Sequence, residues 1–589
     1  MVSFVSERLE VTMNKILLFI PFVIFCNCTE SENQQDDIGI ADSDFDVVAH
    51  ISSEPDGLHP LNSLSINTIN IFKNLHKTLL KIDLVSLELI PDLATQLPEQ
   101  IDSNTFKYNL REDVEWDNGK TLLSEDIRFS LLLALCPLNN APQKRTSLEA
   151  FVDSIEIMDK TSFTYVTKFP YAGANYIWGD LPIISKSFYD PEDVLKELSF
   201  YSCKTNNYPY SQQIQDWFTS FNSRQYSHNP KFINGLGPYK LTHWEEGQHI
   251  TIEKKDNWWG KDIQSIYHRA NPQKIHFKVI ADEQTTNVAL LNNEIDVAYA
   301  LSSAQAHDLG NDEHFKKQFN LNLIDVFGIT FMAINSRPSE NTGNPVLEDQ
   351  AVRLAMSYST PYAEVLNSIY NMGSRQVSIV NKHREYYHHD LKMPTLNLKI
   401  ADSILTSAGW IDQNQDGIRE NELNGERLSL AFELGYVNNP SFKIMAELIA
   451  ASFLQIGIRA ELKPIQANMM FQKLISQDYD VFISSISGDG GFEDLSQLLH
   501  TSAWEQHAFN FTGFGDDESD QLLDRINKSF DKNNQNELYL RLQEKFNEQA
   551  TFIILYSLQQ KIAVSKKFIN PICYAEKPSI LLNALEIAP

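Results

Sequence analysis

Two loops in the sequence carry side chains whose types and spacing could do chemistry. The first loop places oxygen-bearing side chains at alternate positions, in Asp412, Asn414 and Asp416, and follows them with Gly417, which allows a sharp turn. Calcium-binding loops begin in this way, and the residue in the position of Ile418 contributes a backbone carbonyl oxygen. The spacing therefore predicts that Asp412, Asn414, Asp416 and Ile418 could surround one calcium ion.

The rest of this first loop departs from the calcium pattern. The twelfth position, where a bidentate glutamate is expected, holds Leu423, although Glu420 or Glu422 could take its place. No second flanking helix of an EF-hand is evident in the sequence. A calcium ion here would have a structural role, the alternative is a plain surface turn, and we expect no other cofactor.

The second loop is rich in glycine and carries one carboxylate. An apolar strand is predicted within residues 480–494, and it ends at Gly488, Asp489 and Gly490. A carboxylate placed in this way could pair with the ammonium group of a ligand through a charge-assisted hydrogen bond. The alternative is a turn in which Asp489 binds its own backbone, as is common in glycine-rich loops.

A third segment contains His383, His388 and His389, with Arg384 and two tyrosines between them. Imidazoles are ligands for transition metals, so nickel or haem binding is one interpretation. Polar segments of this kind are usually solvated, and we interpret this one as a solvated loop.

Motifs of the common hydrolases and nucleotide-binding enzymes do not occur in this sequence. We find no GxSxG elbow, no HExxH helix and no Walker loop. Acidic residues are plentiful, but their abundance says nothing about catalytic geometry, and a Ser-His-Asp set stays open. We therefore expect a binding protein without catalytic activity, with a secreted hydrolase as the rival class.

The composition is that of a globular protein with a strong acidic excess. The chain has 589 residues, of which 42% are hydrophobic and 21% charged, and this length predicts about three or four compact units. The 49 basic and 77 acidic residues give a net charge of −28. Such a charge argues against nucleic acid as a partner and against docking to anionic lipid through a basic patch.

The beginning of the chain has the pattern of an export signal. Residues 13–28 contain a lysine, an apolar run too short to span a bilayer as a helix, and Cys28, and residues 29–44 form a polar tether. This arrangement resembles a bacterial lipoprotein signal, in which Cys28 becomes the lipidated residue. Cys26 is the less favoured site because bulky Phe25 precedes it, and a plain cleaved signal is the alternative.

Strands and helices alternate along the rest of the chain, which predicts a mixed α/β fold. The remaining cysteines, Cys136, Cys203 and Cys573, allow at most one internal disulfide. Strands are predicted at residues 250–253 and 274–280, and helices at residues 124–135 with Ser124 as N-cap, 442–456 and 517–550.

Four motifs in a fixed order suggest a family. They are Pro91-Asp92-Leu93-Ala94, the segment 106–120 with Trp116 and an Asn118-Gly119 turn, Gly235-Leu236-Gly237-Pro238-Tyr239, and Asp256-Asn257-Trp258-Trp259-Gly260. Together they resemble the extracytoplasmic solute-binding proteins of family 5, the oligopeptide- and dipeptide-binding proteins of ABC transporters. The resemblance runs from about residue 45 to the C-terminus.

This resemblance implies an α/β fold like that of periplasmic binding proteins (type II, cluster C), with two lobes, a hinge and an extra domain. Residues 293–297 and 552–563 would be the hinge strands. Lobe 1 would consist of residues 45–82, 224–297 and 559–589, its extra domain of residues 83–223, and lobe 2 of residues 298–558.

The resemblance also implies which residues contact the ligand. Asp489, next to Gly488, matches the aspartate that binds the α-amino group of a peptide. Ser65 and Ile66 match a segment that pairs with the extended ligand backbone. Tyr556 on the return strand, and Tyr436 before the helix at residue 440, would line the cavity.

Two departures from the family pattern affect the ligand. Ser485 and Ile486 stand where many members carry a tryptophan, and residues 435–440 lack the arginine that clamps the carboxylate of a dipeptide. A strict dipeptide specificity is therefore disfavoured, which leaves longer peptides or another solute.

The resemblance implies the solute-binding component of a peptide ABC transporter. It would be a monomeric, membrane-anchored lipoprotein in the periplasm or on the surface of a bacterium, and it would deliver oligopeptides to a permease. The alternatives are the same fold with an oligosaccharide, nickel or haem as ligand.

Overall fold

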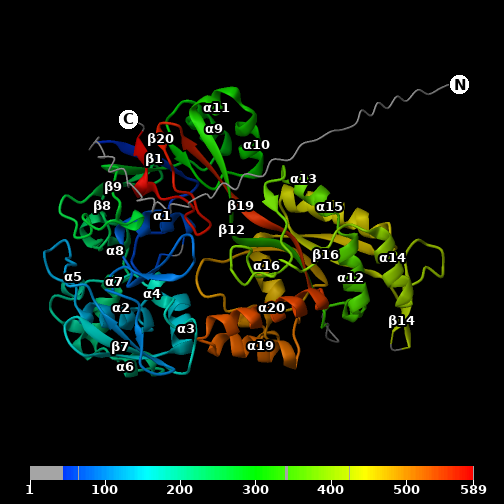
Figure 1. Ribbon diagram of the computed structural model, residues 1–589, viewed down its shortest axis with the longest axis horizontal. Helices are drawn as coiled ribbons and strands as arrows, with labels where there is room; N and C mark the ends of the chain where they lie inside the picture. The colour runs from blue at the N-terminus through cyan, green and yellow to red at the C-terminus, as the bar shows by residue number, and fades with distance from the viewer. Residues whose placement is uncertain (1–43, 64, 338–342, 424, 588–589) are drawn as a thin grey trace, which may run out of the picture. The chain divides into compact units, whose positions relative to one another are not determined.

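The largest sheet joins strands from almost the whole length of the chain (Figure 1). The computed structural model describes residues 44–63, 65–337, 343–423 and 425–587. Ten of the eleven strands follow one path, in the order β17 (Arg459–Ile465), β16 (Ala431–Val437), β18 (Val481–Ser487), β12 (Phe319–Ile334), β19 (Phe552–Ser565), β11 (Val297–Ala298), β1 (Asp46–Ile51), β10 (Lys274–Val279), β9 (His249–Lys254) and β8 (Tyr239–Glu245), and β13 (Gly373–Ser374) pairs with β19 beside this path.

Two long antiparallel strands, β12 and β19, connect the two ends of this sheet. β19 is buried at both ends and half-buried at residues 558–561, whereas β12 is buried from Val326 to Ile334 and exposed or half-buried from Asn320 to Asp325. The pairing is interrupted by a bulge between Asp325 and Ile329, which bends the strand where the burial changes. The predicted return strand at residues 552–563 is thereby confirmed as β19.

The first predicted hinge strand, residues 293–297, is wrong in position. Asn293 has a positive φ of 58° and lies in a turn, and only Val297 of this segment belongs to a strand. The strand at this place, β11, is too short to link the two ends of the large sheet. The long strand β12 forms this link instead. The predicted division into lobe segments stays a prediction.

Four smaller sheets and a set of helices complete the fold. The four-stranded sheet has the order β4 (Glu99–Gln100), β5 (Thr105–Asn109), β7 (Ser162–Thr167), β6 (Val152–Ile157), and the two-stranded sheets are β2 (Leu80–Ile82) with β3 (Leu89–Pro91), β14 (Glu420–Leu423) with β15 (Glu426–Ser429), and β20 (Phe568–Ile569) with β21 (Glu586–Ile587). The helices of at least seven residues are α1 (Ile66–Leu75), α2 (Ser124–Leu135), α3 (Pro142–Phe151), α7 (Gln212–Phe221), α9 (Glu283–Leu291), α10 (Ser303–Asn311), α12 (Gln350–Ser359), α13 (Tyr362–Ser368), α14 (Leu398–Ser407), α15 (Pro440–Leu454), α16 (Ala467–Ile475), α19 (Asp517–Lys528) and α20 (Lys532–Gln549), and shorter ones are α4 (Ile177–Asp180), α5 (Lys186–Tyr189), α6 (Phe200–Lys204), α8 (Gln225–His228), α11 (Glu313–Gln318), α17 (Ser496–Leu499) and α18 (Thr501–Glu505).

The predicted helices exist, with two corrections. The predicted helix at 517–550 is two helices, because the chain leaves the helical path after Lys528 and Asp531 caps α20 through the backbone N–H of Asn534. In α2 the N-cap is Leu123 instead of Ser124, and the Asp126 carboxylate accepts a hydrogen bond from the Leu123 N–H at 2.9 Å. An acidic side chain at this end is favoured by the helix dipole.

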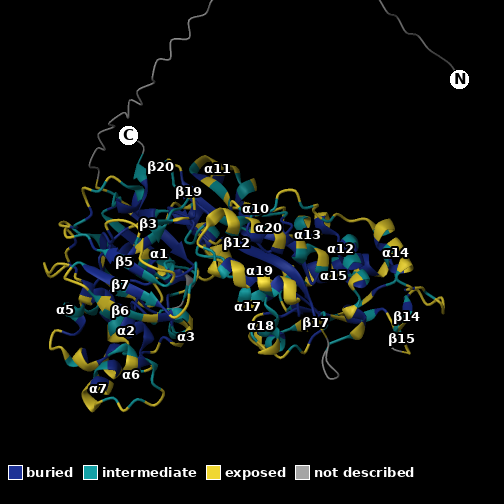
Figure 2. Ribbon diagram, turned by 60° about the horizontal axis from the view of Figure 1, so that its bottom comes forward, coloured by how far each residue is buried: buried dark blue, intermediate teal, exposed yellow. Residues whose placement is uncertain are grey.

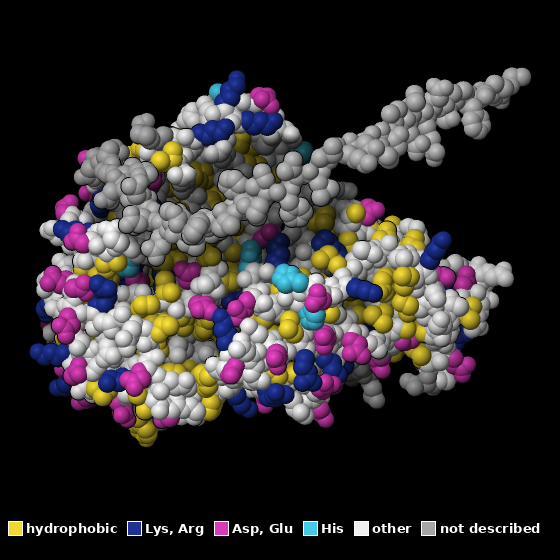
Figure 3. Space-filling view, in the orientation of Figure 1, with side chains coloured by type: hydrophobic (Ala, Val, Ile, Leu, Met, Phe, Trp, Pro, Cys, Tyr) yellow, Lys and Arg dark blue, Asp and Glu magenta, His cyan; other side chains and the backbone are white. Residues whose placement is uncertain are grey.

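The inner strands of the large sheet are mostly buried, its edge strand β17 has no buried residue, and exposed residues gather on the outer faces of the helices (Figure 2). The hydrophobic side chains form separate clusters: one is built from residues 61–236, another covers the β1–β10–β9–β8 side of the sheet, and two more pack around β12, β16 and β18. Full burial of each large apolar side chain stabilises the fold by about 1.5–3 kcal/mol. Acidic and basic side chains are interspersed on the face drawn in Figure 3.

The predicted signal, the tether and Cys28 lie outside the described residues. Among the residues that are described, no helix is long and apolar enough to cross a membrane. Cys136, Cys203 and Cys573 are free thiols, and the first two are buried.

Candidate functional site

The glycine-rich loop begins where β18 leaves the centre of the sheet. The first four residues of β18 are buried, and Ser487 pairs with Gly328 in the bulged part of β12. The chain then turns at Gly488, whose N–H donates to the carbonyl oxygen of Phe327 at 2.5 Å. Asp489, which follows β18, therefore lies near the bulge of β12, where β12 and β19 change from buried to half-buried.

Asp489 is exposed at the tip of this loop. Its Oδ1 accepts a hydrogen bond from the Gly491 N–H at 2.8 Å, so Asp489 does make the turn considered from the sequence. The other carboxylate oxygen accepts no hydrogen bond from any described residue. One oxygen thus fixes the loop and the other stays available to a cation.

Arg384 holds the glycine-rich loop through hydrogen bonds to its backbone. Its guanidinium donates to three consecutive carbonyl oxygens, those of Asp489 at 3.1 Å, Gly490 at 3.0 Å and Gly491 at 2.5 Å. The Arg384 side chain is only 7% exposed and stands 5.2 Å from the ring centroid of Phe327. A planar guanidinium suits this task because its donors have fixed directions.

Burial of Arg384 corrects the interpretation of its segment as a solvated loop. Arg384 and Tyr387 are buried, whereas His383 and His389 are exposed. The His383 Nε2 lies 3.1 Å from the Asp325 carbonyl oxygen, and the His388 Nε2 lies 3.3 Å from a Glu544 carboxylate oxygen. These contacts hold the segment against β12, which contains Asp325, and against α20, which contains Glu544.

Two further carboxyl groups flank Asp489. The Glu576 carboxylate accepts a hydrogen bond from the Gly490 N–H, and Glu493 lies 3.9 Å from the Arg384 Nε. Burial raises the pKa of both Glu493 and Glu576, and the charge of Asp489 raises both further, while Arg384 and Lys73 respectively oppose the shift. Three carboxyl groups are thus gathered around the loop.

A cavity of about 370 Å³ opens beside the loop. Its wall includes Gly491, Phe492 and Arg384, together with Leu87 and Tyr176 from an earlier part of the chain. Leu87 also packs with Phe327 and Ala575 in a small apolar cluster under the loop. The cavity wall is mixed, with charged residues such as Glu88 and Lys532 beside apolar ones such as Phe530, and the cavity volume is in the range of small-molecule sites.

Comparison with known proteins identifies the family. Residues 88–506 match the family described as bacterial extracellular solute-binding proteins, family 5 Middle. The chain belongs to this family. The oligopeptide-binding protein AppA of Bacillus subtilis (strain 168) is 20% identical to this family 5 protein over 554 residues, which are 92% of each chain. The dipeptide-binding protein of Escherichia coli (strain K12) is 19% identical over 515 residues, 85% of this chain and 87% of the relative.

Solved structures of the family share the fold. The oligopeptide-binding protein AppA from Bacillus subtilis in complex with a nonapeptide aligns with a TM-score of 0.66 and 18% identity over 92% of this chain and 99% of its own. NikA from Brucella suis in complex with Fe(III)-EDTA aligns with a TM-score of 0.74 and 19% identity over 92% and 100%. The predicted fold class, an α/β fold like that of periplasmic binding proteins, is therefore confirmed.

The other residues predicted to contact the ligand in this family 5 protein lie at the start of α1, on β16 and on β19. Ser65 caps α1, accepts from the Asn67 N–H at 3.3 Å and uses its own N–H to donate to Asp56 at 3.1 Å, and Ile66 begins the helix. Tyr436 on β16 and Tyr556 on β19 are 4% and 6% exposed and pack in one core cluster. None of them is joined to Asp489 by a described hydrogen bond, and their ligand contacts stay predictions.

The predicted calcium loop connects α14 to β14. Asp412 and Asp416 accept hydrogen bonds from the N–H groups of Gly417 at 3.0 Å and Ile418 at 2.8 Å, and Asn414 accepts from the Asp416 N–H at 2.8 Å. The Oδ1 of Asp412 is buried and has no hydrogen-bond partner among the described residues. The oxygen atoms thus form a turn with one unsatisfied acceptor, which fits a hard cation.

Proposed function

We propose that this family 5 protein binds extracytoplasmic oligopeptides and delivers them unaltered to an ABC permease. The amino terminus of the peptide is held by Asp489, and the adjoining residues extend into the cavity beside Gly491. The observation that carries this proposal is the free oxygen of Asp489, presented on a loop that Arg384 and Glu576 fix in place. The sequence relatives that are named as oligopeptide- and dipeptide-binding proteins support the ligand class.

The electrostatics of the loop favour a cationic group. Asp489, Glu493 and Glu576 are opposed by two nearby cations, Arg384 and Lys73. At about 4 Å and an effective dielectric constant near 20, one charge pair is worth roughly 4 kcal/mol. An α-ammonium group that lies against Asp489 reduces the repulsion among the three carboxylates as well as forming its own bond.

Proteins named for other solutes share this fold. NikA and HbpA2 share the fold, but at 19% and 17% identity they support the fold alone. The cavity wall includes one histidine, His383, whose Nε2 lies close to the Asp325 carbonyl oxygen. Peptide is the favoured ligand because several sequence relatives are named as peptide-binding proteins.

The cellular location of the protein and its attachment to the membrane are part of the same proposal. Lipidation at Cys28 would hold a monomer at the outer side of a bacterial membrane, with residues 29–44 as its tether. The role needs no bond to be broken in the ligand, so we propose binding without catalysis.

Calorimetric titration tests the proposed function. We expect saturable binding of peptides that have a free amino terminus, and chromatography after the titration should recover them intact. Cleaved peptide would point to a hydrolase, and the absence of binding by any peptide would exclude the proposal.

Peptide affinity should fall as the pH is lowered. Glu493 and Glu576 have raised pKa values, so they take up protons at a higher pH than free carboxylic acids, and the ammonium group favours their ionised forms. Each carboxyl can reduce the affinity by at most about tenfold per pH unit below its pKa. Titrations between pH 8 and pH 5 measure the effect, and the double variant Glu493→Gln with Glu576→Gln should show a flatter profile. A pH-independent affinity in the unmodified protein would contradict this role.

We further propose the loop at Asp412 as the place of a structural calcium ion. Calcium added to chelator-treated protein should raise the free energy of unfolding, by about 2.7 kcal/mol at a hundredfold excess over Kd. Thermal unfolding measures this change, and Asp416→Ala should remove it while peptide binding persists. An equal unfolding temperature with calcium and with chelator would show that the loop is a turn without metal.

A further inference from the structure

A β-bulge in β8 brings three metal-binding side chains to one face of the sheet edge. Leu241 pairs with Ile252 of β9, but the next pair is His243 with Thr251, so that one extra residue lies in β8. The bulge shifts the alternation of side chains by one position. Trp244 therefore packs against the core with Ile250, while His243 and Glu245 face outward.

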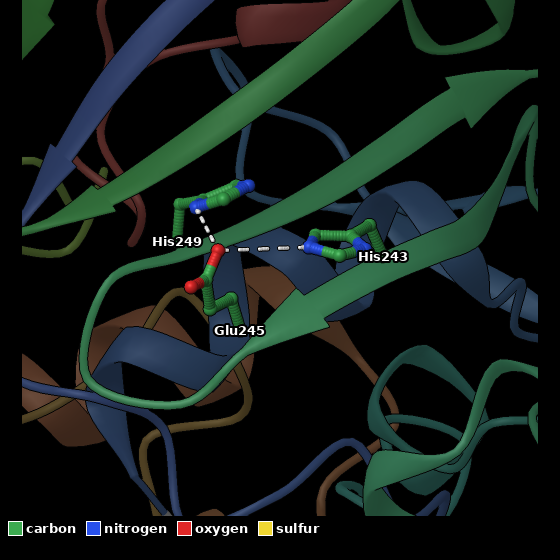
Figure 4. A group of neighbouring side chains, drawn as sticks. All are labelled: His243, Glu245 and His249. Carbon is green, nitrogen blue, oxygen red and sulfur yellow. Dashed lines mark ion pairs between the residues drawn. The ribbon is translucent and has the colours of Figure 1, made fainter.

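The third side chain comes from the neighbouring strand. His249 on β9 pairs directly with Glu245 across the hairpin. Figure 4 shows both imidazoles directed to the same oxygen of the Glu245 carboxylate. The Glu245 Oε2 is 3.9 Å from the His243 Nε2 and 3.6 Å from the His249 Nδ1, and one donor atom from each of the three residues lies within 4.8 Å of the others.

The surroundings hold this group in place and leave it open to solvent. Gln248 donates from its amide nitrogen to the Glu245 Oε1 at 2.6 Å, which leaves Oε2 directed to the histidines. The hairpin is anchored by Glu54, which accepts from the Trp244 Nε1 at 2.6 Å and from the Gly247 N–H at 3.2 Å. The adjacent ammonium group of Lys278 is paired with Glu294 at 2.7 Å.

We infer that His243, Glu245 and His249 form a binding site for a divalent transition-metal ion such as Zn²⁺. Two imidazole nitrogens and one carboxylate oxygen suit this class of ion better than Ca²⁺ or Mg²⁺, which prefer oxygen ligands. A tetrahedral Zn²⁺ site places its donors about 3.3 Å apart, so the side chains must close by roughly 1 Å. Their exposure permits this rotation, and water completes the coordination.

This site is separate from the proposed peptide site. Six strand-to-strand steps lie between β9 and β18 in the sheet order, which correspond to roughly 29 Å at about 4.8 Å per step. Metal binding at the β8–β9 hairpin is therefore testable without reference to peptide binding.

Calorimetric titration of Zn²⁺ into the untagged, chelator-treated full chain tests the inference. We expect saturable 1:1 binding that becomes weaker by tenfold or more in His243→Ala and in His249→Ala. Gln248→Ala, which removes only the orienting hydrogen bond, should weaken binding by about tenfold. All variants should keep the circular dichroism spectrum and the peptide affinity of the unmodified protein.

The exposed histidine of α11 provides the control. His314 lies on another element, and His314→Ala should leave Zn²⁺ binding unchanged. The inference is overturned if Zn²⁺ does not bind saturably, or if binding persists in both His243→Ala and His249→Ala.

Discussion

Replacement of Asp489 by asparagine should weaken the binding of a peptide with a free amino terminus by about 1.5–3 kcal/mol, roughly a tenfold to hundredfold rise in Kd. The asparagine keeps an oxygen that can accept the hydrogen bond from the Gly491 N–H, so the turn should survive. Only the negative charge is lost, and with it the charge-assisted bond to the ammonium group. Calorimetry at constant pH measures the difference.

Two comparisons make this result specific. An N-acetylated peptide carries no ammonium group, and we expect it to bind weakly and almost equally to the unmodified protein and to Asp489→Asn. Asp308→Asn changes an exposed aspartate of α10 and should leave peptide affinity unaltered. An unchanged affinity in Asp489→Asn would remove Asp489 from the site.

The second large effect is expected from Arg384→Met, which should destabilise the fold by about 3–5 kcal/mol. The variant leaves three loop carbonyls without their donor and Glu493 without its nearby cation. Because Arg384 opposes the raised pKa of Glu493, its removal should raise that pKa further. A carboxyl whose pKa is raised by folding stabilises the fold at low pH and loses this contribution as the pH rises. The loss of stability caused by Arg384→Met should therefore be larger at pH 8 than at pH 5.

Chemical unfolding of matched arginine variants measures this effect. Arg541 and its partner Glu518, 3.3 Å away, are each 53% exposed, so Arg541→Met should cost no more than about 1 kcal/mol. Arg384→Lys keeps the charge but lacks the planar fork, and it should lie between the two. Equal stabilities of Arg384→Met and Arg541→Met would show that Arg384 does not support the loop.

The sequence is most informative where local patterns determine structure. Strands such as β9 and β10 follow from the alternation of apolar residues, and α15 follows from the Pro440-Ser441 start. The fold class follows from four motifs in order. The break between α19 and α20 is harder to predict, because its signal is only the capping aspartate Asp531 in a polar stretch.

The sequence predicts only part of the candidate site, because some of its contacts join residues that are far apart in the chain. Asp489 is found because it follows a strand directly. Arg384 and Glu576 are 105 and 86 residues from their partners in the loop, and no local pattern predicts such contacts. The one available signal is an arginine followed closely by two tyrosines in a segment that otherwise resembles a surface loop.

The most direct test of the central claim is mass spectrometry of the small molecules released when freshly purified, untagged protein is denatured. We predict a mixture of intact oligopeptides with unmodified amino termini, in a total amount close to one per protein chain. Recovery of haem, a metal chelate or a sugar in that amount, with no peptide, would contradict the account.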